Sequence, residues 1–171
     1  MALDDAIARL ARQIEATQRE ERILVDPEQI ATFRREGACD LHRVCSEFVA
    51  SVNGKLTKPL LELSPERYSP DSFRESGVNL FQISSQGRQM QIVFEATSPL
   101  TSTEKFAIPY ISEGEVRTYN QSMLERFEIR TLSIFLCVEE TRATWRFYDW
   151  RTLSTGPVDY KLFVTLMEPL F

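Results

Sequence analysis

Several features that would assign a function at once are missing from this sequence. Its 171 residues include one histidine, three cysteines and six glycines. The single histidine, His42, excludes a site in which one copy of the chain supplies several histidines to a metal. The glycines form neither GxGxxG nor GxxxxGK[ST], which are the common phosphate-binding loops. We therefore expect no bound metal and no cofactor.

The cysteines are too few and too irregularly placed for a disulfide scaffold. Cys39, Cys45 and Cys137 make an odd count, which is typical of a reduced, cytoplasmic protein. Cys39, His42 and Cys45 follow one another at intervals of three, but on a helix they fan over about 120° and two turns, unlike a zinc site. We expect a buried Cys45, with Cys39 and His42 on the surface.

Positive charge is also scarce, and long apolar runs are absent. The formal net charge is -5, whereas a protein that binds nucleic acid without base specificity needs an excess of lysine and arginine. The longest strongly apolar stretch, near 134–138, is far shorter than the roughly 20 residues of a membrane-spanning helix. Asp4 and Asp5 occupy the place of the basic region of an export signal. We expect neither a nucleic-acid nor a membrane partner.

What remains is an ordinary folded composition, with 43% hydrophobic and 26% charged residues. A chain of this length most simply forms one domain. The residue patterns predict a single α+β domain over residues 1–171. Its helical part covers about 1–56, a connector covers about 57–78, and an antiparallel sheet covers about 79–171.

The first predicted helix, about 3–21, has a narrow apolar seam. Leu3, Ile7, Leu10 and Ile14 repeat at spacings of four, three and four. Such a seam suits one helix laid against another, either within the domain, which is the simpler interpretation, or across a homodimer.

A second, long helix is predicted from 27 to about 53. Asp26 and Pro27 form a helix start, and an apolar stripe continues at helical spacing through Gly37. The alternative is a break at Gly37, with Asp40 capping a new helix. Because Gly37 lies on the stripe, the continuous helix with a close contact at this glycine is preferred.

Alternating apolar and polar residues predict strands from Asn79 onward. We expect a hairpin of about 79–84 and 88–96, another pair of strands around Glu113 and Gly114, a brief helix opened by Ser122 and Glu125, a long strand at about 127–139, a returning strand in "RATWRFYDW" and a last strand in "DYKLFVTLME". The expected fold is thus N-terminal helices, including one long helix, packed on a curved antiparallel sheet of about five to seven strands.

The aromatic and basic stretch "ATWRFYDW" is the strongest candidate for a binding surface. Alternation directs Trp145 and Phe147 to one face, predicted to be core, and Arg146, Tyr148 and Trp150 to the other. A guanidinium beside two amphipathic rings suits a planar ligand, an anion or a protein interface. Asp149, between two aromatic residues, is a candidate for an altered carboxyl pKa, although an ion pair with an arginine is the more ordinary interpretation.

These observations favour a non-catalytic binding or interaction protein with an unknown protein or small-molecule partner. It would use a concave sheet face or the Arg146, Tyr148 and Trp150 face, and a homodimer is compatible with the apolar seam. The first alternative is an enzyme with a pocket between helix and sheet, in which Glu95 or Asp149 acts as acid or base. The second is a single-stranded nucleic-acid binder.

Overall fold

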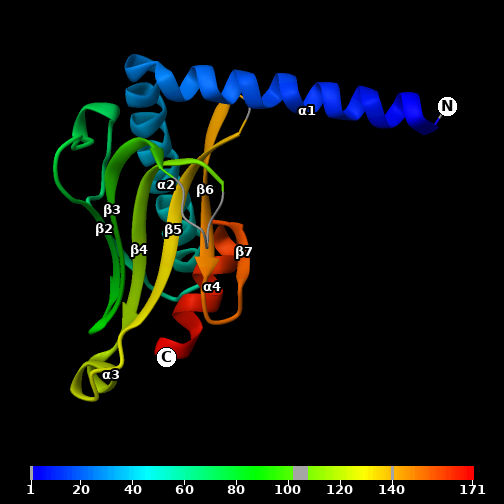
Figure 1. The fold of residues 1–171 in the computed structure, drawn as a ribbon. Coiled ribbons are helices and arrows are strands. Elements are labelled where there is room, and N and C mark those ends of the chain that lie inside the picture. Colours follow the sequence, from blue (N-terminus) through cyan, green and yellow to red (C-terminus); the bar gives the residue numbers. More distant parts are fainter. Residues whose placement is uncertain (1, 102–107, 140) are drawn as a thin grey trace.

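The computed structural model describes residues 2–101, 108–139 and 141–171. Two helices lead into a seven-stranded antiparallel sheet whose spatial order follows the chain (Figure 1). The elements are α1 (Ala2–Val25), α2 (Pro27–Asn53), β1 (Glu62–Ser64), η1 (Pro70–Ser72), β2 (Asn79–Ser85), β3 (Arg88–Thr101), β4 (Tyr110–Tyr119), α3 (Gln121–Glu125), β5 (Arg130–Glu139), β6 (Arg142–Asp149), β7 (Ser154–Pro157), α4 (Tyr160–Met167) and η2 (Glu168–Leu170). The predicted α+β class, with a long helix against a curved antiparallel sheet, is confirmed.

Helix α2 is continuous through Gly37, as the apolar stripe predicted. An oxygen of the Asp26 side chain accepts a hydrogen bond from the Glu28 N–H at 3.1 Å, and Pro27 stands in the first turn. A Cβ at Gly37 would lie 2.7 Å from a methyl carbon of Leu136 on β5. The glycine therefore allows the helix to lie close to the sheet.

The core fills the space between α2 and the sheet. We call the face of the sheet toward α2 the inner face and the opposite one the outer face. Alternation along β3 places Met90, Ile92 and Phe94 in this core with at most 1% of their surface exposed. The indole N–H of Trp145 on β6 donates to the Gly37 carbonyl oxygen at 2.8 Å. Strand β6 is thereby fastened to the middle of α2.

Strand β4 passes straight through the site of a predicted turn. Glu113 and Gly114 lie inside β4, where they pair with Glu95 and Phe94 of β3. A Cβ at Gly114 would approach the Phe94 Cβ to 2.7 Å, so this glycine serves a close approach of strands rather than a turn. The hairpin prediction was wrong at this point. Its first part, at 105–107, lies outside the described residues.

The predicted last strand is instead helix α4. Asp159 caps it by accepting a hydrogen bond from the Leu162 N–H at 3.1 Å. Leu162, Phe163 and Met167 are buried, and the Phe163 ring packs edge-on against Phe48 of α2 at 5.5 Å. Because this apolar run is short, the sequence matched a strand as well as a helix.

His42 lies in the core, although a surface position was expected. Its Nε2 lies 2.7 Å from the carbonyl oxygen of Pro65. Its ring stacks on Tyr68 at 5.5 Å and meets Phe81 at 5.2 Å. The histidine therefore joins α2 to the connector. Cys39 is partly exposed and Cys45 is buried, and both thiols are free.

Within the ranges that the structure describes, no helix combines the length and the apolar character needed to cross a membrane.

Candidate functional site

The residues singled out in the sequence lie around the end of β6, but they do not form one surface. Arg146 pairs with Phe135 of β5, and Tyr148 pairs with Ser133. Both are half-buried on the outer face, whereas Trp145 and Phe147 face the core as predicted. Alternation therefore assigned the two faces of β6 correctly.

Arg146 and Tyr148 border a small second hydrophobic cluster on the outer face. Tyr110 and Cys137 form its centre with at most 1% of their surface exposed, and Phe135 and Tyr148 pack against them. The Nε of Arg146 is buried and has no hydrogen-bond partner among the described residues. Burial raises the pKa of Cys137 to about 12, an effect that the nearby Arg146 guanidinium opposes.

Asp149 is the last residue of β6, and Trp150 begins the turn that follows it. The Asp149 carboxylate accepts a hydrogen bond from the Arg151 N–H at 2.9 Å, which is a turn-forming contact. Trp150 is 58% exposed, and the Arg151 guanidinium lies 5.4 Å from its ring centre. The predicted set is therefore divided between a half-buried pair on the sheet and an exposed tryptophan on a turn.

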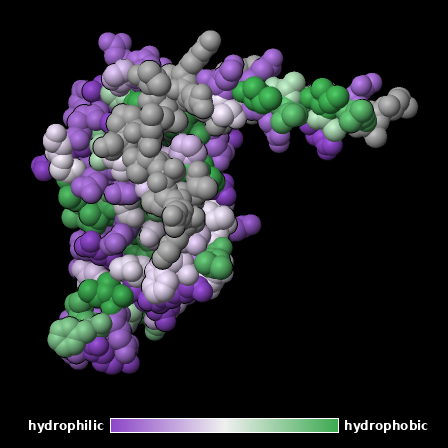
Figure 2. Space-filling model, in the orientation of Figure 1, coloured by the Kyte–Doolittle hydropathy of each residue, from purple (hydrophilic) through white to green (hydrophobic). Residues whose placement is uncertain are grey.

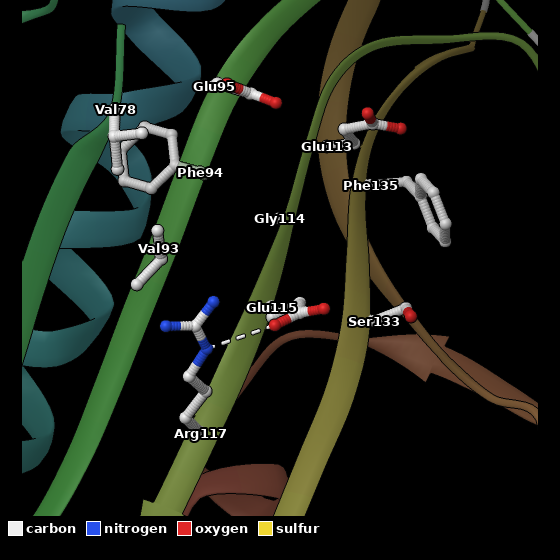
Figure 3. Close-up of a pocket in the computed structure, with 10 residues that line it drawn as sticks. All are labelled: Val78, Val93, Phe94, Glu95, Glu113, Gly114, Glu115, Arg117, Ser133 and Phe135. Carbon is white, nitrogen blue, oxygen red and sulfur yellow. Dashed lines mark hydrogen bonds and ion pairs between the residues drawn. The ribbon is translucent and has the colours of Figure 1, made fainter.

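A shallow acidic hollow lies beside this cluster on β3, β4 and β5 (Figure 3). It measures about 380 Å³, and the carboxylates of Glu95, Glu113 and Glu115 line it together with Arg117. The Nε of Arg117 donates to Glu115 at 3.1 Å. Burial and then the Glu113 carboxylate raise the pKa of the Tyr110 hydroxyl. Among the described residues, no group of three or more histidine, cysteine or acidic side chains is arranged to hold a metal.

A second recess, which we call the apolar groove, lies at the C-terminal end of α2. It measures about 460 Å³. Its wall comes from α2, the connector, the turn between β2 and β3, α4 and Phe171. Leu56, Val164 and Phe171 remain 38%, 42% and 69% exposed there. The Arg88 Nε donates to the Leu170 carbonyl oxygen at 3.0 Å, and its guanidinium covers the Phe171 ring at 4.8 Å.

The sequence could not reveal the apolar groove, because its wall comes from segments that are far apart in the chain. Periodicity marked Phe48 and Val52 only as part of the stripe on α2. The contribution of α4 to the groove could not be predicted, because its residues were expected to form a strand.

A third exposed apolar surface is the α1 seam, defined as Leu3, Ile7, Leu10 and Ile14. Helix α1 extends away from the sheet and α2 (Figure 1), and Figure 2 shows hydrophobic residues along it. The four seam side chains are 73%, 57%, 56% and 52% exposed. The predicted seam is therefore present, but it does not pack inside the domain as the simpler interpretation held.

Comparison with models of protein families, with curated proteins and with solved structures found no match for this chain.

Proposed function

We propose that this chain is a non-catalytic interaction protein that associates with a second copy of itself through the α1 seam. The observation that carries this proposal is the exposure of four aliphatic side chains in one line on a projecting helix. Isolated helices are marginal in water, and most helical stability in proteins comes from packing an apolar face. Helix α1 has such a face, and a partner that covers it would stabilise the helix.

The energy available from the seam is sufficient for reversible association. Full burial of a leucine or isoleucine side chain contributes about 1.5–3 kcal/mol. Since more than half of each side chain is exposed, covering the four contributes about 4–8 kcal/mol per copy. Two copies that cover each other's seams double this value. Association costs at least about 4 kcal/mol in lost translation and rotation, so we expect a dissociation constant in the micromolar range.

The outer face remains part of the proposal as a surface for a further partner. Arg146 and Tyr148 lie half-buried at the edge of the small cluster, and the Trp150 ring is exposed on the turn that follows β6. Large exposed aromatic residues and arginine are enriched where proteins contact each other. The core fills the space between α2 and the sheet, and the acidic hollow lies on the opposite face, so the geometry favours contact rather than catalysis.

The three free thiols support the cytoplasmic setting that we propose for the protein. Two of them are fully buried.

Light scattering of the wild type and of an Ile7→Asp, Ile14→Asp double variant tests the proposal. We expect the wild type to approach twice the monomer mass as its concentration rises, and the double variant to keep the monomer mass. Ala8→Asp together with Ala11→Asp, on exposed positions off the seam, adds the same charge and serves as control. A monomer mass for the wild type at every concentration refutes the proposal.

A further inference from the structure

The structure contains an apolar helix face without a cover and an apolar groove without an occupant. The helix face is the α1 seam, and the groove lies between the C-terminal end of α2 and α4. Amphipathic helices commonly bind proteins by laying three or four aliphatic side chains into such a groove. From these two features we infer that α1 of one copy docks into the apolar groove of a second copy. This inference rests on the proposed self-association and names the surface that receives the seam.

The positions of the two features allow both contacts to form in one symmetric dimer. Helix α1 leaves the body at the N-terminal end of α2, whereas the groove lies at its C-terminal end (Figure 1). At 1.5 Å per residue, α2 separates them by about 40 Å, and α1 itself extends about 36 Å. A reciprocal contact requires a two-fold axis that sets the two bodies antiparallel, so that each α1 meets the partner's groove. The contact is then reciprocal and closed, as in most homodimers.

The apolar character of the two surfaces also agrees. The seam from Leu3 to Ile14 is about 17 Å long, or three helical turns. The groove of about 460 Å³ is lined mainly by aliphatic and aromatic side chains. Its wall keeps Leu56, Val164 and Phe171 partly exposed to water, so an occupant removes apolar surface on both sides.

The charges around both surfaces complement each other. The groove is bordered by one cation, Arg88, and one anion, Glu168. Helix α1 carries Asp4 and Asp5 in its first turn and arginines at positions 9 and 12. If the acidic first turn of the docked α1 lies beside Arg88, an arginine of the same helix can lie beside Glu168, so both contacts join opposite charges.

Two variants in the groove test the inference by sedimentation equilibrium. Val164→Asp places a carboxylate in the groove wall at a side chain that is already 42% exposed, so the fold tolerates it. We expect the dimer to weaken at least tenfold. Leu80→Asp, at a 47% exposed position on β2 away from the groove, is the matched control and should leave the dimer unchanged. Thermal unfolding of both variants checks that the fold is kept.

Disulfide trapping then distinguishes the possible partners of the seam, in a Cys39→Ser background. We expect a mixture of the Ile7→Cys and Val164→Cys variants to form a mixed disulfide dimer, and a mixture of Ile7→Cys and Leu80→Cys to form none. A chain that carries both Ile7→Cys and Val164→Cys should form disulfide dimers.

Three results overturn the inference. If the Ile7→Asp, Ile14→Asp variant is monomeric while Val164→Asp still dimerises fully, self-association stands but the groove is not the receiving surface. If the double-cysteine chain forms an internal disulfide at low concentration, the groove takes α1 of its own chain. If the wild type is monomeric throughout, both the inference and the proposed function fail.

Discussion

Replacing Gly37 by alanine tests how closely α2 approaches the sheet. Two opposing effects decide the result. Alanine is favoured over glycine in a helix interior by about 1 kcal/mol. The new Cβ, however, would lie 2.7 Å and 2.8 Å from the two Cδ atoms of Leu136, well inside the roughly 3.5–4.0 Å of an ordinary carbon contact. Leu136 is fully buried, so it has little room to move.

Overpacking of a core costs about 1–3 kcal/mol, so we expect Gly37→Ala to lower the free energy of unfolding by about 0–2 kcal/mol. In a Leu136→Ala background the obstructing methyl groups are gone. In that background Gly37→Ala should raise the free energy of unfolding by about 1 kcal/mol, because only the higher helix propensity of alanine remains. The sign of the effect thus reverses between the two backgrounds.

The wild type, the two single variants and the double variant form a double-mutant cycle. Their free energies of unfolding are measured by urea unfolding, which is followed by tryptophan fluorescence. Ala50→Gly, at an exposed position of the same helix, measures the propensity term without a packing change and should cost about 1 kcal/mol. Equal stabilisation by Gly37→Ala in both backgrounds would refute the close contact between α2 and β5.

Three further predictions concern the backbone and the thiols. Phe127 has φ +56° and is 95% exposed, so Phe127→Gly should raise the free energy of unfolding by about 1 kcal/mol; a loss would show that the ring makes a stabilising contact. With Ellman's reagent at pH 8, the folded protein should show one accessible thiol, Cys39, and two that react only on unfolding, since Cys45 and Cys137 are fully buried. Burial raises the pKa of each buried thiol from 9.0 to about 12. The unfolded chain therefore loses these protons first as the pH rises above 9, and stability should fall between pH 9 and 12, by up to about 1.4 kcal/mol per pH unit and thiol. Equal urea midpoints at pH 8 and 10.5 would contradict this.

Individual helices and strands could be predicted from the sequence only where their local residue patterns were unambiguous. The stripe on α2 extends over seven turns, so it placed the helix correctly from Pro27 to Asn53. The first hairpin, β2 and β3, was found because two alternating stretches flank a turn that contains Gly87, and this glycine has a positive φ in the structure. Helix α4 was missed because a short apolar run fits a strand and a helix equally well.

Gly114 shows why a local signal was misleading. A glycine between alternating residues usually marks a turn, but here it lets β4 pass close to the Phe94 side chain. That requirement comes from a neighbouring strand, which the sequence does not identify.

The candidate surfaces, too, could be predicted only where they depend on a local residue pattern. The α1 seam is a local pattern, so its residues could be read from the sequence, but its exposure depends on where α1 leaves the body. The two faces of β6 followed from alternation. The apolar groove forms where segments far apart in the chain meet, and the burial of His42 depends on Tyr68 of the connector. Neither has a signature in the spacing of nearby residues.

Hydrogen exchange of α1 at two protein concentrations tests the central claim most directly. If a second copy covers the α1 seam, the amides of residues 3–18 should be protected at high concentration and exchange much faster after dilution below the dissociation constant. The amides in the middle of α2, away from both contact surfaces, should change much less with concentration than those of α1. Exchange in α1 that does not change with concentration would contradict self-association through the seam.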